Sequence, residues 1–152
     1  MKELTFVIMS LWIFTLGMSA QELVSDTIDC GNIQVIIGMP KVMSRSGHVS
    51  RYEEGFGKAY AVMAGNKFMV LGLHFGPMSY DVRFEGGEMN IYNCKLGNIA
   101  RSRAFIQDSL YYRQDSYFQY NIDISYENVP EEKKQLMDSI LDNVVIRRIS
   151  PK

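Results

Sequence analysis

The sequence has little of the residue types from which metal sites and disulfide frameworks are built. It contains two cysteines, Cys30 and Cys94, and two histidines, His48 and His74. These four residues are scattered and lack the close ligand spacing of a zinc site, so no metal and no cofactor is expected. Two cysteines can pair in an oxidising compartment, and a Cys30–Cys94 disulfide and two buried thiols both remain open.

Net charge and long apolar runs are also scarce. The 16 Lys and Arg residues are balanced by 17 Asp and Glu residues. Because nucleic-acid binding draws on a basic excess that neutralises phosphates, it is not expected here. After residue 20, no apolar run is long enough to form a transmembrane helix. The expected partner is therefore a protein or a small-molecule ligand that the sequence does not identify.

The first twenty residues have the pattern of a secretory signal peptide. Lys2 precedes the apolar run Leu4–Leu16, which is too short to span a bilayer comfortably, and small residues end at Ala20. We expect cleavage after Ala20 and a secreted or periplasmic protein, with an uncleaved anchor as the alternative. Cys30 is not preceded by a lipobox. Residues 21–152 then have the length of a single domain.

The clearest sequence pattern in the chain predicts a β-hairpin. Two strand-like runs, Lys58–Ala64 and Lys67–Phe75, flank Gly65-Asn66. A two-residue loop of this type favours the primed turns, whose twist matches that of the flanking strands. In this register Met63 faces Phe68.

The same register places Tyr60 opposite Leu71. Both runs are apolar on both faces for much of their length. Such strands are covered on both sides, or are covered on one side and meet a ligand or partner on the other. Gly72 interrupts the second run, and a strand glycine predicts a bulge or a close backbone approach, with the bulge preferred.

The remaining chain is divided by pattern into strands and polar connections. Further strands are expected at Asn32–Met39, Tyr80–Phe84, Met89–Cys94, Ile99–Ile106, Tyr117–Tyr126 and Val144–Ile149. Polar stretches predict a loose lead-in at Gln21–Asp29, a long exposed loop or frayed hairpin at Lys41–Glu54, and a turn at Gln114–Ser116.

One helix is expected near the end of the chain. Asn128 is a candidate cap, and Pro130 suits the first turn. Apolar residues then recur at helical spacing, which predicts a buried stripe: Leu136, Met137, Ile140, Leu141 and Val144. The fold class is therefore α+β, an antiparallel sheet of about six to eight strands with a C-terminal helix packed on one face.

The end of the chain, SYFQYNIDISYENVPEEKKQLMDSILDNVVI, resembles the close of the PsbP-like superfamily. In that family a long strand leads into a helix and a last short strand. The opening strand that ends in Pro40 is similar as well. The resemblance implies an antiparallel sheet between helices and a non-enzymatic accessory or binding role, and it carries no functional residue over.

Tyrosines near the end of the chain form the most interesting candidate contact site. Tyr111 and Tyr112 are followed by Arg113. Tyrosine combines an apolar ring with a polar hydroxyl and suits protein interfaces and sugars. The alternative is that these tyrosines fill the sheet, since tyrosine is a favoured strand residue.

Catalytic motifs are absent from the sequence, which has no HExxH, GxSxG or CxxC pattern. We therefore expect a non-enzymatic binding or accessory domain. One alternative is a small envelope hydrolase that uses His48 and the serines of the 41–54 loop. Another is a structural subunit of an envelope assembly. His74 is expected to be a hydrogen-bonded core residue, and Asp123 to face solvent by strand alternation.

Overall fold

The computed structural model describes residues 22–77, 90–95 and 99–150, with the side chains of residues 90–95 and 99–100 excepted. The predicted signal peptide and the predicted strand Tyr80–Phe84 lie outside these ranges. No helix in the described ranges is long and apolar enough to cross a membrane.

The described chain is mostly strand, with short helices between strands. In chain order the elements are β1 (Leu23–Cys30), β2 (Ile33–Pro40), α2 (Lys41–Ser44), β3 (His48–Tyr52), β4 (Gly55–Ala64), β5 (Lys67–Phe75), β6 (Asn90–Lys95), β7 (Ile99–Gln107), β8 (Leu110–Tyr117), the 3₁₀ helix η1 (Phe118–Tyr120), β9 (Ile122–Val129), α3 (Glu131–Asp142) and β10 (Val145–Arg148). Most of the predicted strands are therefore present, including Ile99–Ile106.

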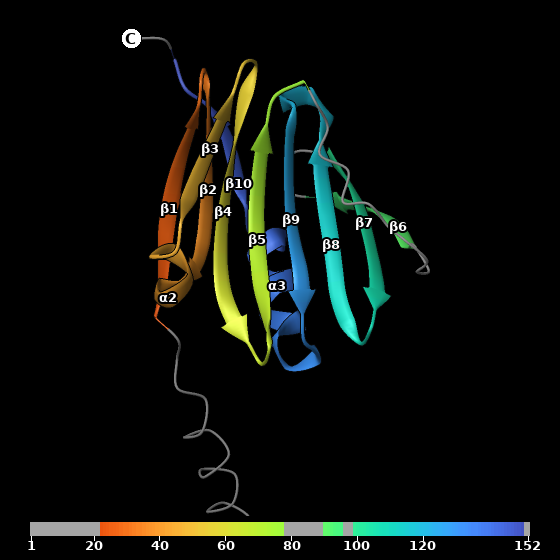
Figure 1. Ribbon diagram of the computed structural model, residues 1–152. Coiled ribbons are helices and arrows are strands. Elements are labelled where there is room, and N and C mark those ends of the chain that lie inside the picture. The colour runs from red at the N-terminus through yellow and green to blue at the C-terminus, as the bar shows by residue number, and fades with distance from the viewer. Residues whose placement is uncertain (1–21, 78–89, 96–98, 151–152) are drawn as a thin grey trace, which may run out of the picture.

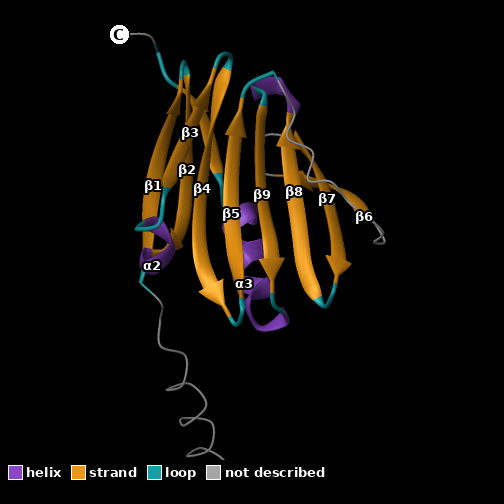
Figure 2. Cartoon of the chain, viewed as in Figure 1, coloured by secondary structure: helices purple, strands orange, loops and turns teal. Residues whose placement is uncertain are grey.

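Within the described residues, the strands form two antiparallel sheets. The larger sheet has seven strands in the order β3-β4-β5-β9-β8-β7-β6, and the smaller has three in the order β1-β2-β10. The helix α3 contacts β9, β8 and β2 and lies behind β5 and β9 (Figure 1). The smaller sheet and α3 together form the second layer of the fold (Figure 2). The predicted antiparallel α+β architecture is confirmed, and the second sheet was not foreseen.

The core lies between the large sheet and this second layer. From the large sheet it takes Tyr60, Leu71 and Ile124, and from β2 it takes Val35 and Ile37, all of them fully buried. The predicted helix stripe joins it: Met137, Ile140, Leu141 and Val144 are buried, and Leu136 packs against them half-buried. The second layer lies against one face of the large sheet, and we call the opposite face the open face.

The predicted hairpin is confirmed in its register. β4 and β5 are joined at Gly65-Asn66, with Tyr60 opposite Leu71 and Met63 opposite Phe68. Gly65 has φ of 66°, the left-handed conformation that a primed turn requires.

The preferred bulge at Gly72 is wrong. The pairs Ala59–Gly72 and Gly72–Ser125 continue unbroken registers on both sides of β5. A Cβ atom at Gly72 would lie 3.3 Å from the Ser125 hydroxyl oxygen. The glycine therefore accommodates a close neighbour on the open face.

The first polar stretch is a strand, β1, and not the loose lead-in that its composition predicted. Its inward-facing positions include Asp26, whose carboxylate accepts hydrogen bonds from Lys58 at 2.7 Å and from the Tyr60 hydroxyl at 2.5 Å. Burial works to raise the pKa of Asp26, but these two bonds, the charge of Lys58 and a backbone hydrogen bond from Thr27 together leave the pKa lowered. A charged residue thus occupies a core-facing strand position because β4 supplies its partners.

The 41–54 segment is not a long loop. It forms the short helix α2 and the strand β3, which pairs with β4, so the alternative of a hairpin is nearer to the structure. All five residues of β3 are exposed, which is why the segment has no apolar alternation to read.

The predicted strand Tyr117–Tyr126 is broken at its start. Phe118–Tyr120 form η1, and Asn121 follows in the left-handed region with φ of 52°. Phe118 is 63 % exposed. From Ile122 onward the alternation holds.

Asn128 is not the helix cap. It adopts φ of 56° beside a register shift between β8 and β9, and the residue that precedes α3 is Pro130. The Asn128 amide nitrogen donates to the carbonyl of Phe68 at 3.1 Å, and its amide oxygen accepts from the Tyr112 hydroxyl at 2.6 Å. Its side chain therefore links three strands.

The turn between β7 and β8 lies earlier than predicted, at Asp108 and Ser109, which both have positive φ. Gln114–Ser116, the predicted turn, is buried inside β8. Both segments contain turn-forming residues. Gln114–Ser116 stays in a strand because Asp115 has binding partners inside the fold.

Arg113 is a main partner of Asp115. The sequence predicted Arg113 to be a surface contact, but it is only 3 % exposed. Its guanidinium binds both carboxylate oxygens of Asp115, at 3.0 and 2.8 Å. It also donates to Asp138 at 3.3 Å and to Asp142 at 2.6 Å on α3. The planar fork of arginine suits such bidentate pairing, and the cluster ties α3 to β8.

Asp138 extends this cluster to β9. It accepts hydrogen bonds from Lys134 at 2.6 Å and from the Tyr126 hydroxyl at 2.8 Å. Burial acts to raise the pKa of Asp138, but these bonds and the nearby Arg113 leave it lowered. Asp138 is therefore ionised at neutral pH.

Cys30 is a free, buried thiol. Burial, helped by the nearby Asp29 carboxylate, raises its pKa to about 11. In the structure Cys30 is therefore a buried thiol and not part of a disulfide. Cys94 lies in β6, at the far edge of the large sheet from β1 (Figure 1), and its side chain is outside the described set.

Candidate functional site

The open face of the large sheet contains a pocket of about 250 Å³, formed by β3, β4, β5 and β9. We call it the open-face pocket. Its floor consists of Gly57 and Ala59 on β4 and Gly72 on β5. The register sets Ala59 opposite Gly72 and Gly57 opposite His74, so three adjacent positions on one face carry almost no side chain. The pocket exists because larger side chains surround this bare area.

One end of the pocket is closed by two aromatic rings. Tyr52 and His74 stack with ring centroids 5.4 Å apart and an interplanar angle of 12°. They come from β3 and β5, which flank β4 and are therefore about 9.6 Å apart at the backbone. Their side chains meet over β4, where Tyr52 is opposite Gly55 and His74 is opposite Gly57. Gly55 leaves room for this contact, because a Cβ atom there would lie 3.0 Å from the Tyr52 ring.

Polar groups line the two sides. His48 and Ser50 stand on β3, and Asp123, Ser125 and Glu127 stand on β9. The β9 residues alternate with core residues, so they share the open face. Asp123 faces this side as alternation predicted, but its side chain is only 12 % exposed, because it lies within the pocket wall.

His74 is the one described residue of the pocket whose buried nitrogen has no hydrogen-bond partner. The atom is Nδ1, which lies 3.9 Å from Asp123 Oδ2. The expectation of a hydrogen-bonded core histidine is therefore wrong. Burial lowers the pKa of His74, and the Asp123 carboxylate only partly opposes this. The imidazole is neutral at pH 7 and does not neutralise Asp123.

The candidate residues from the sequence are not brought together. His48 lines the open-face pocket, but Arg113 is buried on the opposite face of the sheet. The Tyr111 hydroxyl donates to Glu131 of α3. Tyr112 stacks on Phe105 with centroids 4.4 Å apart. These tyrosines hold described elements together and do not form one surface with Arg113.

The serines of the 41–54 segment are also dispersed. The Ser44 hydroxyl donates to the carbonyl of Lys41, and the Ser46 hydroxyl donates to that of Met43. Ser46 also accepts from the backbone of Ala61 at 2.9 Å. Only Ser50 lines the pocket, so the hydrolase alternative rests on Ser50 with His48.

Sequence reasoning missed Tyr52, His74 and the glycine floor, although part of the signal was available. The Gly65-Asn66 turn fixes the register of β4 and β5, and that register alone places Gly57 opposite His74. Two strand glycines on one face of adjacent strands indicate a bare area of sheet. Nothing local to β3 indicates that Tyr52 reaches across it.

The comparisons with known proteins add no family to this geometry. No family model, curated protein or solved structure matches the chain. In the described part of the chain, no group of three or more His, Cys, Asp or Glu side chains is placed to hold a metal ion.

We expect His74→Phe to stabilise the protein. Phenylalanine keeps an aromatic ring against Tyr52 and removes a buried nitrogen without a partner, which costs about 1 kcal/mol or more. The melting temperature should rise by several degrees at pH 7. The gain should widen as pH falls below 6.5, because unfolded histidine binds a proton there before the folded His74, whose pKa is lowered, does so.

Calorimetry of both proteins between pH 7 and pH 5 measures this difference. His48→Phe, at an exposed position on the same face, is the control and should leave the melting temperature nearly unchanged. A His74→Phe protein that melts below the wild type would show that the imidazole has a stabilising partner.

Proposed function

We propose that this protein is a secreted or periplasmic, non-enzymatic binding domain whose ligand occupies the open-face pocket. The location rests on the signal-peptide pattern of the first twenty residues. The resemblance of the chain's end to the PsbP-like superfamily points in the same direction, because that family's role is accessory and not catalytic.

The observation that carries the proposal is the glycine at position 57. A strand glycine weakens a sheet relative to a residue with a side chain. Gly57 does not have the positive φ that would demand glycine. A Cβ atom there would have a single neighbour within 4 Å, the carbonyl oxygen of Leu73 at 3.8 Å. Neither backbone conformation nor packing requires glycine, so an open pocket floor is the remaining benefit.

Filling the floor tests the proposal. Gly57→Leu should place a side chain in the pocket and abolish ligand binding, while the protein without ligand melts at or above the wild-type temperature. The assay is a thermal-shift screen with alkylamines, glycans, peptides and fatty acids. A ligand at about 100 times its dissociation constant adds about 2.7 kcal/mol to the wild type.

Gly38→Leu is the matched control. Gly38 is also a strand glycine with ordinary φ and no atom within 4 Å of its Cβ position, but it lies in β2 of the smaller sheet. The Gly38→Leu variant should show every ligand-induced rise in melting temperature that the wild type shows. A ligand that stabilises the wild type and Gly57→Leu equally would place its site elsewhere and refute the pocket as the binding site.

A further inference from the structure

We infer that the open-face pocket takes an organic cation, a primary ammonium or guanidinium group on an apolar stem. This inference rests on the proposed function and specifies its ligand class. It is argued from the charge of the pocket walls and from the apolar strip that continues the pocket floor.

The charges that line the pocket favour a cation. Asp123 and Glu127 both stand on the β9 side. Lys58 is the one lysine or arginine of the described lining, and its ammonium group is bound to Asp26 at 2.7 Å, on the core face of β4. His74 adds no positive charge at neutral pH. The pocket is therefore acidic, and an anionic ligand would meet repulsion from β9.

Asp123 is the group that most needs a cationic partner. Its side chain is largely covered, and the facing His74 Nδ1 is 3.9 Å away, beyond hydrogen-bond distance. An ammonium or guanidinium group placed between Asp123 and the Tyr52 ring could donate to the carboxylate. A charge-assisted bond of this kind is stronger than one from a neutral donor, and the aromatic face adds attraction for a cation.

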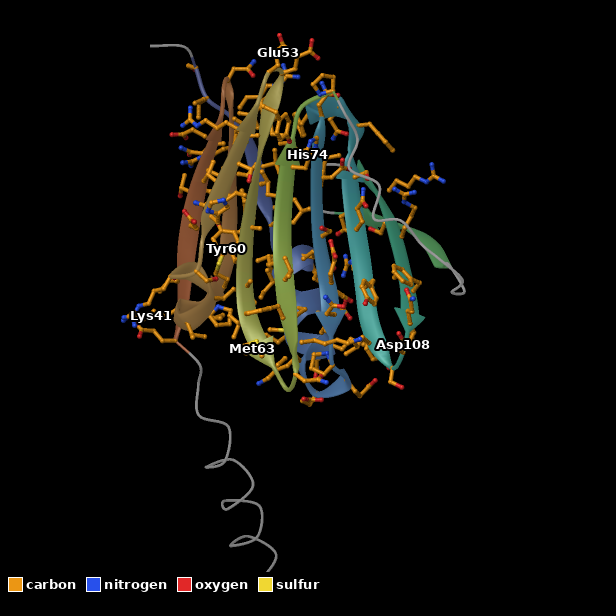
Figure 3. The ribbon with its side chains drawn as sticks, in the orientation of Figure 1. Lys41, Glu53, Tyr60, Met63, His74 and Asp108 are labelled. Carbon is orange, nitrogen blue, oxygen red and sulfur yellow. The ribbon has the colours of Figure 1, made fainter. Side chains whose placement is uncertain are left out.

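The other part of the ligand is indicated by an apolar strip on the same face. The pairs Ala61–Val70 and Met63–Phe68 continue the open-face rows of β4 and β5 beyond the floor. Met63 is 54 % and Phe68 57 % exposed. Met63 and His74 lie at opposite ends of this face (Figure 3).

The length and chemistry of the strip define the stem. From His74 to Phe68 along β5 is about 20 Å at the usual rise of a strand. The alanine and valine side chains of the floor and the strip offer no hydrogen bonds to a polyhydroxylated ligand. A hydrocarbon stem would cover the strip and remove apolar surface from water. An amphiphilic cation matches both ends.

Three probes with six carbon atoms each separate the ligand classes: n-hexylammonium, n-hexanol and n-hexanoate. Each is titrated into the ¹⁵N-labelled full chain, and the backbone amides of Gly57 and Gly72 report occupation of the floor. We expect n-hexylammonium to shift both amides at concentrations at least 10-fold lower than n-hexanol does. We expect n-hexanoate to shift neither.

Asp123→Asn keeps the shape of the side chain and removes its charge. It should weaken n-hexylammonium binding by about 10-fold or more and leave n-hexanol binding unchanged. Glu132→Gln is the control, because Glu132 is exposed on α3, which covers the other face of the sheet, and it should bind all three probes as the wild type does.

Two results would overturn the inference, and they have different meanings for the pocket. If n-hexanol and n-hexanoate shift Gly57 and Gly72 as readily as n-hexylammonium, the pocket binds apolar stems without regard to charge, and only the cationic class is wrong. If n-hexylammonium shifts neither amide, the pocket does not bind an organic cation and the inference is refuted. Whether the pocket binds another ligand is then tested by the thermal-shift screen of Gly57→Leu.

Discussion

Arg113→Met is expected to lower the free energy of unfolding by about 3–5 kcal/mol, because it removes the guanidinium that binds the buried Asp115 carboxylate. Asp115 is fully buried, and its carboxylate accepts two hydrogen bonds from the Arg113 guanidinium. Methionine has a similar length and no charge, so the change tests the ionic bonds and not the packed volume. Urea unfolding, with the slope compared between variants, measures the loss.

The double variant Arg113→Met, Asp115→Leu distinguishes the loss of this ion pair from general damage. It also removes the carboxylate that loses its guanidinium in the single variant, so most of the lost stability should return. Arg148→Met, at an exposed position on β10, is the control and should change stability by less than about 0.5 kcal/mol. A single variant that loses under 1 kcal/mol would contradict a structural role for the cluster.

Gly55→Ala is expected to be nearly as costly, at about 3 kcal/mol, through overpacking. A Cβ atom at Gly55 would overlap the carbonyl oxygen of Phe75 and come within 3.0 Å of the Tyr52 ring. Neither neighbour can yield cheaply, because Phe75 belongs to the β4–β5 ladder and Tyr52 is stacked on His74. The melting temperature should fall by more than 10 °C for a domain of this size.

Gly57→Ala provides a matched comparison two residues along the same strand. Its added methyl group has one neighbour, at 3.8 Å, and the residue's φ is ordinary. The variant should be as stable as the wild type or gain about 0.5 kcal/mol from the reduced freedom of the unfolded chain. Equal losses at Gly55 and Gly57 would mean that β4 tolerates no side chain at either position, and would remove the argument for an open floor.

The parts of the fold that sequence predicted are those whose signals are local. The Gly65-Asn66 turn lies between two apolar runs, so residues within a short span determine both the hairpin and its register. The helix is similar, since Met137, Ile140 and Leu141 repeat at the helical period. For the helix, the core also lies on the side that the pattern indicates.

The parts that were missed depend on partners far along the chain. The local sequence predicts a surface position for Arg113. Its burial depends on Asp138 and Asp142 of α3, which lie 25 and 29 residues later in the chain. Asp26 reads as part of a loose polar segment until Lys58 binds it, 32 residues later. A charged side chain can occupy an inward position only when such partners exist, and no local pattern reveals them.

The candidate site was missed for a related reason. Tyr52 and His74 are separated by β4 and most of β5, and they meet only because β3 pairs with β4. The segment that forms β3 was interpreted as a long exposed loop or a frayed hairpin, so its residues had no predicted face. Once β3 is placed, the three strands determine which side chains surround Gly57.

The order of the smaller sheet has a consequence for mechanical force. Its central strand β2 is flanked by the first and last strands of the described chain. Leu23 at the start of β1 pairs with Pro40 at one end of β2, and Arg148 at the end of β10 pairs with Ile33 at the other. Tension applied through Leu23 and Arg148 would therefore pull β1 and β10 in opposite directions along β2. Both ladders would be loaded in shear, with their hydrogen bonds sharing the load and not opening one after another.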